Sequence, residues 1–185
     1  MKYFLSIDQG TTSSRSIIFD ANLNLVTDAQ EEYDLTYPED GWVELEPKKI
    51  IETVTNTLNK VVSADIGLEA CGITNQRETT IVWSKSTGEA IYPGIVWQDR
   101  RTHQYCSYLK SNGHEQIIRE KTGLLLDPYF SATKIKWILD NVDGAREKAS
   151  KGELLFGTVD SYLIYMLSKE KNHYTDVTNA SRTLL

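Results

Sequence analysis

Three extended runs at the start of the chain precede any helical pattern and constrain the fold most. Residues 3–7 and 16–19 are mostly apolar or aromatic, and the small polar segment 8–14 between them predicts a hairpin. A third extended run follows the turn at residues 22–24 and continues from Leu25 towards Tyr33. The order predicts an antiparallel meander, so a sheet forms the first part of the fold.

The hydrophobic period changes to that of a helix after Pro47, a residue suited to a first helical turn. One helical stripe holds Ile50, Ile51, Val54, Leu58, Val61 and Val62. Further strands are expected at residues 70–74, 79–83 and 94–97, with a helix from about Gln98. Beyond residue 113 the chain is expected to be mostly helical, with a segment at 134–139 and a stripe of Val159, Tyr162, Leu163, Met166 and Leu167. The pattern predicts an α/β fold with a mixed sheet and helices packed on it.

Length and charge narrow the possible functions. A chain of 185 residues without a Pro/Gly/Ser-rich linker favours one compact domain. The 20 basic and 26 acidic residues give a net charge of −6, which argues against a nucleic acid partner. We therefore expect any bound phosphate to be held locally.

Cysteine, histidine and hydropathy patterns indicate neither a metal centre nor a membrane. Cys71 and Cys106 lack paired spacing and neighbouring histidines, so they are expected to be reduced thiols without a metal. The three histidines have no triad or metal-ligand spacing. The apolar run at residues 1–7 is broken by Asp8, and no stretch approaches a membrane span of about 18 residues. A cytoplasmic protein without a membrane partner is expected.

The segment DQGTTSSR at residues 8–15 has the composition of a phosphate-binding loop. Gly10 would permit close approach and positive φ, and the hydroxyl residues and Arg15 would add hydrogen bonds to phosphate. Asp8 could hold Mg²⁺ directly or through water. The segment is neither a Walker A loop nor a Rossmann fingerprint, and composition alone favours a polar hairpin tip without a ligand, because such tips are common.

A second polar segment, NQRETT at residues 75–80, lies between two expected strands. Arg77 beside Glu78 offers donors and an acceptor for the hydroxyl groups of a small polyol. Trp97 could cover the carbon backbone of such a ligand, and the hydroxyl of Tyr129 could reach it. The alternatives are a surface ion pair for Arg77 and Glu78, and structural roles for Trp97 and Tyr129.

Longer motifs carry a family resemblance along the whole chain. They are residues 8–15, 72–80 (GITNQRETT), 96–101 (VWQDRR), 127–131 (DPYFS), 152–160 (GELLFGTVD) and 178–183 (TNASRT). Together they resemble the glycerol kinases. The pattern Y-x-S-x-x-K-I-x-W-I-x-D-N at residues 129–141 also resembles the signature of the wider FGGY carbohydrate kinase family.

The resemblance implies a ribonuclease H-like fold of the actin and hexokinase type, in which two such domains flank a cleft for ATP–Mg²⁺ and glycerol. It implies that Gly10, Thr11, Thr12, Ser13 and Arg15 contact the nucleotide phosphates, with Asp8 near Mg²⁺. Arg77, Glu78 and Tyr129 would hydrogen-bond glycerol, and Trp97 would line its apolar side.

Members of this family are considerably longer, and their catalytic base, an aspartate followed by glutamine, lies downstream of these motifs. Residues 1–185 are therefore interpreted as an incomplete N-terminal FGGY kinase domain with no catalytic residue of its own. We expect weak or absent ATP binding and no turnover from it alone. The longer protein is expected to transfer the γ-phosphate of ATP to glycerol, giving sn-glycerol 3-phosphate.

Two other functions stay open at this stage. One is a kinase for another small polyol or sugar, with the same fold and phosphate loop. The other is a non-catalytic, actin-like nucleotide-binding module that leaves the polyol residues as packing. An incomplete sheet would also expose an edge, so a homo-oligomer is a further expectation.

Overall fold

The computed structural model describes residues 2–63 and 65–185, so Met1 of the apolar run 1–7 lies outside the described residues. The chain forms two compact units. The first comprises the residues up to Leu35 together with Glu46–Gln76. The second comprises Thr36–Leu45 and Arg77–Leu185. Each unit is described by itself.

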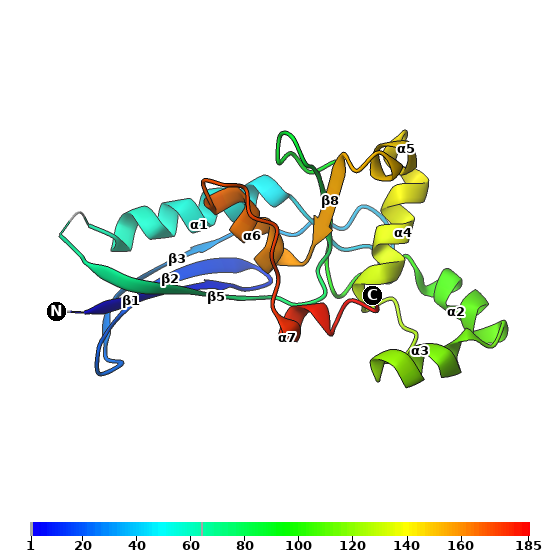
Figure 1. Cartoon of the computed structure of the whole chain (residues 1–185), viewed down its shortest axis with the longest axis horizontal. Helices are drawn as coiled ribbons and strands as arrows, with labels where there is room; N and C mark the ends of the chain where they lie inside the picture. Colours follow the sequence, from blue (N-terminus) through cyan, green and yellow to red (C-terminus); the bar gives the residue numbers. More distant parts are fainter. Residues whose placement is uncertain (1, 64) are drawn as a thin grey trace. The chain divides into compact units, whose positions relative to one another are not determined.

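A four-stranded mixed sheet forms the first unit (Figure 1). Its strands are β1 (Tyr3–Gln9), β2 (Ser13–Asp20), β3 (Leu25–Glu32) and β5 (Leu68–Asn75), in the order β3-β2-β1-β5. The first three strands pair antiparallel, and β5 pairs parallel with β1. The predicted meander and the mixed sheet are therefore confirmed.

Helix α1 (Pro47–Val61) lies along β2 and β3 and covers one face of this sheet (Figure 1). Its buried stripe includes Ile50 and Val54, as the hydrophobic period predicts. Two hydroxyl pairs join helix and sheet, Ser14 to Thr53 at 2.8 Å and Ser16 to Thr57 at 2.9 Å. The helix ends one residue before Val62, which caps it in an extended conformation and is exposed.

The second unit contains two short antiparallel sheets and six helices among its described residues. The sheets pair β4 (Glu44–Leu45) with β7 (Gly94–Ile95), and β6 (Ile81–Ser84) with β8 (Leu154–Gly157). The helices are α2 (His103–Ser111), α3 (His114–Thr122), α4 (Ser131–Asn141), α5 (Ala145–Ser150), α6 (Val159–Leu167) and α7 (Val177–Ala180).

Buried side chains from β6, β7 and α4 form the core of this unit, with Val82, Ile95 and Ile138 in one cluster. The strand expected at residues 79–83 is shifted to Ile81–Ser84, and the one expected at 94–97 ends at Ile95. The helix expected from Gln98 begins only at His103, because the intervening residues form turns. Strands β4 and β8 were not expected from the sequence.

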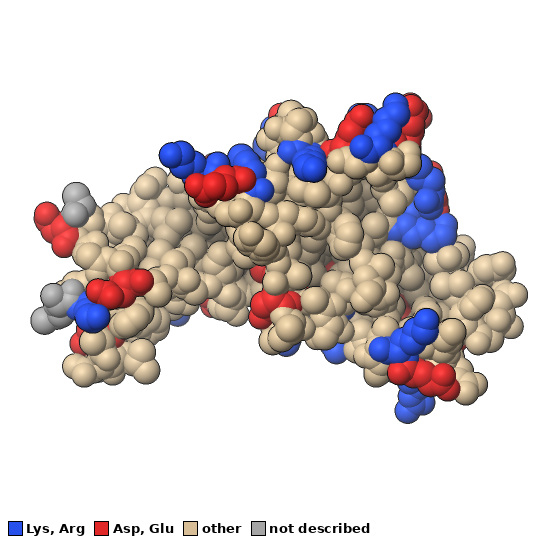
Figure 2. All heavy atoms as spheres, in the orientation of Figure 1, with Lys and Arg blue, Asp and Glu red and all other residues tan. Residues whose placement is uncertain are grey.

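The described helices include none that is long and apolar enough to cross a membrane. Both cysteines are free thiols, Cys71 exposed and Cys106 buried. No group of three or more potential metal ligands occurs among residues 2–63 and 65–185. On the face shown in Figure 2, acidic and basic side chains lie side by side. Among the ion pairs of the second unit, Asp140 pairs with both Lys136 and Arg146.

Candidate functional site

The loop that resembles a phosphate loop is shorter than the sequence suggested. Asp8 and Gln9 belong to β1, and β2 begins at Ser13, so only residues 10–12 connect the strands. The Gly10 N–H donates to the Ser13 carbonyl at 2.8 Å, which closes the turn. The Tyr33 N–H donates to the Thr12 carbonyl at 3.0 Å and ties the loop to the chain beyond β3.

Three side-chain donors converge on the Gly10 carbonyl. They are Gln9 Nε2 at 2.7 Å, the Tyr33 hydroxyl at 2.7 Å and Gln76 Nε2 at 3.0 Å, and all three side chains are buried. Because the peptide is trans and planar, the N–H of Thr11 points away from this cluster. Burial raises the pKa of Tyr33 to about 12, so its hydroxyl stays a donor at neutral pH.

Gly10 meets one of the two expectations placed on it. Its φ is not positive, unlike that of six other glycines among the described residues, so the expected left-handed conformation was wrong. The expected close approach of the backbone is nevertheless present, and it depends on the missing side chain of Gly10. A Cβ at this position would lie 3.3 Å from the Ser13 carbonyl oxygen, a close approach that glycine alone makes without displacement.

Asp8 and Arg15 share the sheet face opposite α1. They stand directly opposite each other in the β1–β2 register, whereas Ser14 and Ser16 face the helix. The Arg15 guanidinium forms an ion pair with Asp28 at 2.7 Å, and the Asp8 residue is exposed. A phosphate that reached Arg15 would therefore compete with a half-exposed carboxylate.

In the second unit, Arg77 and Glu78 lie in a tight turn that separates their side chains. The Thr79 N–H donates to the Arg77 carbonyl at 2.8 Å, and Glu78 between them has a φ of 63°. This is a γ-turn of the rare kind with positive φ, which is strained for a residue with a side chain. Arg77 is exposed, whereas Glu78 is buried with 3% of its surface accessible.

Buried and partly buried donors hold Glu78 at both its side chain and its backbone. Arg182 Nε donates to Glu78 Oε1 at 2.6 Å. The Glu78 carbonyl accepts from Thr80 Oγ1 at 3.0 Å, Ser131 Oγ at 3.2 Å and Lys134 Nζ at 3.3 Å. Glu78 therefore pairs with Arg182 and not with its neighbour Arg77.

Tyr129 and Trp97 come together in the same unit. Their ring centroids are 5.7 Å apart at an interplanar angle of 62°, an edge-on arrangement. The Tyr129 N–H donates to Asp127 Oδ1 at 2.9 Å, and its carbonyl accepts from Lys134 Nζ at 2.6 Å. Both aromatic residues are partly exposed, so they line a surface instead of filling a core.

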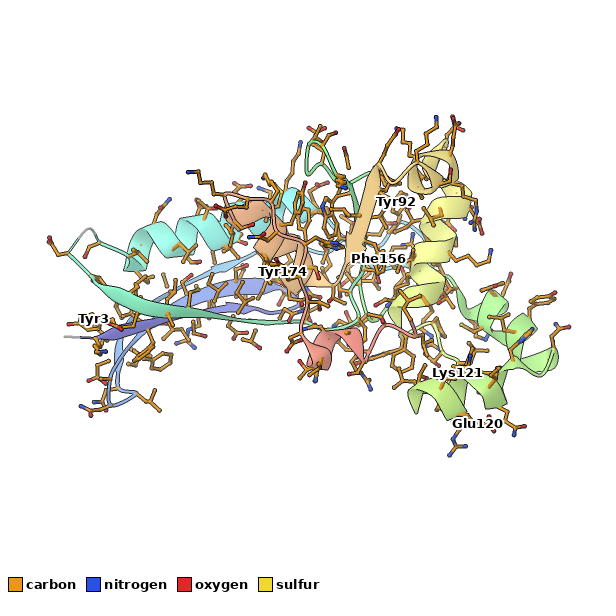
Figure 3. All side chains as sticks on the ribbon, in the orientation of Figure 1. Tyr3, Tyr92, Glu120, Lys121, Phe156 and Tyr174 are labelled. Atoms are coloured by element: carbon orange, nitrogen blue, oxygen red, sulfur yellow. The ribbon has the colours of Figure 1, made fainter. Side chains whose placement is uncertain are left out.

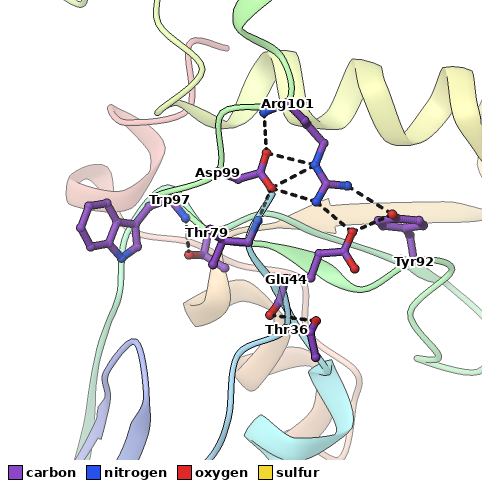
Figure 4. Close-up of polar contacts among 8 residues, drawn as sticks. Thr36, Glu44, Thr79, Tyr92, Trp97, Asp99 and Arg101 are labelled. Carbon is purple, nitrogen blue, oxygen red and sulfur yellow. Dashed lines mark hydrogen bonds and ion pairs between the residues drawn. The ribbon is translucent and has the colours of Figure 1, made fainter. Parts of the chain in front are cut away.

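A buried ionic cluster fixes the segment that carries Trp97 (Figure 4). The Arg101 guanidinium forms ion pairs at 2.8 Å with both Asp99 and Glu44, and it is 3.9 Å from the centre of the Trp42 ring. Asp99 Oδ2 also accepts the Val43 N–H at 2.6 Å. The Trp97 N–H donates to Thr79 Oγ1 at 3.1 Å, which ties this segment to the turn at Glu78.

A cavity of about 120 Å³ is lined in part by Ser131, the residue that donates to the Glu78 carbonyl. Phe156 and Tyr174, both labelled in Figure 3, also line it, together with Gly157 and His173. The cavity lies wholly within the second unit.

The structure therefore groups the sequence-predicted residues in two sets. Asp8, Gly10, Thr11, Thr12, Ser13 and Arg15 lie in the first unit, and Arg77, Glu78, Trp97 and Tyr129 lie in the second. Sequence reasoning missed the side chains that hold them: Gln9, Tyr33 and Gln76 at the loop, and Ser131, Lys134 and Arg182 at Glu78. All of these holding residues except Tyr33 lie within the motifs that resemble the family. Membership of those motifs was the sequence signal that could have identified them.

Comparison with known proteins gives a family match over nearly the whole chain. Residues 3–185 match the N-terminal domain of the FGGY family of carbohydrate kinases. Glycerol kinases of Haemophilus influenzae and Oceanobacillus iheyensis are 57% and 58% identical to it over 188 residues. These alignments cover 100% of the chain but only 37% and 38% of the two relatives, so the chain spans less than two fifths of their length.

Solved structures agree with this match. The crystal structure of Plasmodium falciparum glycerol kinase with ADP superposes with a TM-score of 0.96 at 36% identity, covering 100% of this chain and 38% of that one. A gluconate kinase from Lactobacillus acidophilus superposes at 0.83 over 99% of this chain and 36% of its own, and at 24% identity it shows the fold alone. The expected α/β fold of the actin and hexokinase type is confirmed.

Proposed function

Because the chain belongs to the FGGY family of carbohydrate kinases, we propose that it supplies the phosphate loop and the polyol-binding residues of an ATP-dependent glycerol kinase. The observation that carries this proposal is the cluster of Glu78, Tyr129 and Trp97 beside Arg77, held by buried donors in the second unit. Glycerol kinases over 55% identical to the whole chain support glycerol as the acceptor.

The polyol residues have complementary chemistry for a small triol. Arg77 donates only, the Glu78 carboxylate accepts only, and the Tyr129 hydroxyl does both, so together they can satisfy hydroxyl groups in both directions. The Trp97 ring offers an apolar face to the carbon backbone. In this proposal they orient one terminal hydroxyl for attack on the γ-phosphate of ATP.

The loop at residues 10–12 would receive the nucleotide phosphates. The inward Gly10 carbonyl directs the Thr11 amide outward, the hydroxyls of Thr11 and Thr12 lie on the loop, and Ser13 follows as the first residue of β2. Asp8 fits a Mg²⁺ site, because it is an exposed carboxylate beside the loop and Mg²⁺ takes one or two carboxylates plus phosphate oxygens and water. Bound Mg²⁺ would neutralise phosphate charge there.

The test uses residues 1–185 joined to the region that the Haemophilus influenzae relative carries beyond the match, called here the extended chain. We expect ATP-dependent formation of glycerol 3-phosphate by the extended chain. Arg77→Ala and Glu78→Ala should each lower kcat/KM for glycerol about 100-fold or more, because a charged hydrogen-bond partner of the substrate is lost. Residues 1–185 alone should show no turnover.

Two outcomes would contradict the proposal. Phosphorylation of another polyol or sugar in preference to glycerol would agree with a kinase but would contradict glycerol as its substrate. Nucleotide binding without transfer to any acceptor, by an extended chain that unfolds cooperatively, would favour the non-catalytic nucleotide-binding module. The cytoplasmic location and a homo-oligomeric state stay predictions that belong to this proposal.

A further inference from the structure

Lys134 is a fully buried lysine beside the proposed polyol site. Its side chain projects from the first turn of α4, and none of its surface is accessible. Lys134 Nζ donates to two backbone carbonyls, that of Tyr129 at 2.6 Å and that of Glu78 at 3.3 Å. These two residues are 51 positions apart in the chain, and both are proposed to bind glycerol.

We propose that Lys134 is a positioning residue for glycerol, which fixes the Glu78 carboxylate and the Tyr129 hydroxyl relative to each other by holding both backbones. The inference rests on the proposed function, since it concerns the same site. Lys134 does not itself bind the substrate, because its ammonium is buried against main-chain oxygens.

The strained turn at Glu78 is the main physical argument. A positive φ at a glutamate persists only where surrounding contacts over-determine it. Here three donors meet on the Glu78 carbonyl, from Thr80, Ser131 and Lys134, and two of them come from α4. Helix α4 therefore holds the turn that aims the Glu78 side chain.

The cost of burying the lysine is the second argument. Burying an ammonium costs free energy, and an apolar side chain of similar volume at a buried charged position is often no less stable. Arg182 adds a separate cation to the Glu78 carboxylate, so Lys134 is not needed to neutralise it. What Lys134 provides, and an apolar residue could not, is a pair of hydrogen bonds that joins two site segments.

The test compares steady-state kinetics of variants of the extended chain. Lys134→Met keeps the length and removes both hydrogen bonds, and we expect the KM for glycerol to rise about tenfold or more, since leaving two buried carbonyls without this donor carries a penalty of that order. The KM for ATP should change less than about twofold, because the nucleotide contacts lie on a different loop.

A milder variant and two controls keep the result interpretable. Ser131→Ala removes one donor to the same carbonyl and should raise the KM for glycerol about two- to fivefold, even if Lys134→Met fails to fold. Ile138→Val, a buried change on the same helix, should lower thermal stability without this shift. Lys136→Met removes a partly exposed cation of α4 and should leave both KM values unchanged.

Each outcome decides the inference. An unchanged KM for glycerol in a folded Lys134→Met or Ser131→Ala variant would overturn it while leaving the proposed function intact. A rise of the same size in Ile138→Val would assign the effect to stability and would also overturn it. If the unmodified extended chain does not phosphorylate glycerol, the proposed function falls and the inference falls with it.

Discussion

At the scale of single residues, two backbone carbonyls are the points at which buried side chains hold the proposed ligand-binding segments. Those of Gly10 and Glu78 each accept hydrogen bonds from three side chains. A carbonyl so held fixes its whole peptide plane, and the neighbouring N–H and side chain with it. The functional groups are thus positioned by residues that would not themselves touch a ligand.

Tyr33 gives a direct test of this organisation in the first unit. Tyr33→Phe removes the hydroxyl that donates to Gly10 at 2.7 Å and accepts from Gln9 and Gln76. We expect the free energy of unfolding to fall by about 1–2 kcal/mol and the KM for ATP to rise, because buried amides lose a partner and the loop loosens. Urea unfolding and steady-state kinetics of the extended chain measure both effects.

The control for that variant is Tyr37→Phe. Tyr37 is 69% exposed, so loss of its hydroxyl should change neither quantity. Equal effects of the two substitutions would contradict a specific role of Tyr33 under the loop.

Lys134 makes stability depend on pH. Burial lowers the pKa of Lys134 from 10.5 to about 7, although Asp99, Glu78 and Asp127 act against this and Arg100 adds to it. Between these values the unfolded chain binds more protons than the folded chain. The free energy of unfolding should therefore rise with pH across this window, by up to about 1.4 kcal/mol per pH unit from this group.

Chemical unfolding of the extended chain at several pH values between 7 and 10 measures that slope. Lys134→Met removes the titrating amine, so the free energy of unfolding of this variant should rise less steeply with pH. Parallel pH profiles for the two proteins would show that the buried lysine titrates normally.

At the scale of elements, the sequence predicted regular segments well and irregular ones poorly. The meander and α1 could be predicted because their period is carried by their own side chains, as in Ile50 and Val54. Strands β4 and β8 could not, because β4 has only two residues and β8 pairs with β6 across more than 65 positions of chain. Tertiary pairing, and not local pattern, makes both of them strands.

The same contrast holds for the site. Residue types in the motifs predicted which side chains bind ligands, including Arg77 and Tyr129, and these roles stay predictions. The positive φ of Glu78 and the hydrogen bond from Lys134 to the Glu78 carbonyl could not be predicted, because both depend on contacts between segments far apart in the chain. A glutamate in a strained turn has no local signature in the sequence.

Gly157 tests the close packing of β8 against α6. A Cβ at this position would lie 2.4 Å from Ser161 Cβ, so Gly157→Ala must displace the helix start. We expect a loss of about 1–3 kcal/mol in the free energy of unfolding. Gly67→Ala is the matched control, because nothing lies within 4 Å of its added methyl group, and its stability should stay near that of the parent.

Thermal and urea unfolding of the two glycine variants would be compared in the extended chain. A Gly157→Ala protein as stable as Gly67→Ala would show that α6 yields to the added methyl group without cost.

At the scale of the whole molecule, the chain combines two compact units that each hold one half of the proposed chemistry. The proposed phosphate loop lies in the first unit and the proposed polyol residues lie in the second, and the chain passes from one unit to the other between Gln76 and Arg77. Gln76 donates to Gly10, and Arg77 opens the turn at Glu78. Two adjacent residues thus belong one to each of the two proposed sets.

A comparison of phosphoryl acceptors tests whether glycerol is the substrate of the proposed site. The extended chain would be assayed with ATP and Mg²⁺ against glycerol, gluconate and xylulose, with kcat/KM determined for each. We expect glycerol to be preferred over gluconate and xylulose by about 100-fold or more, and Glu78→Ala to remove most of this preference. Equal or greater kcat/KM for gluconate or xylulose would contradict it.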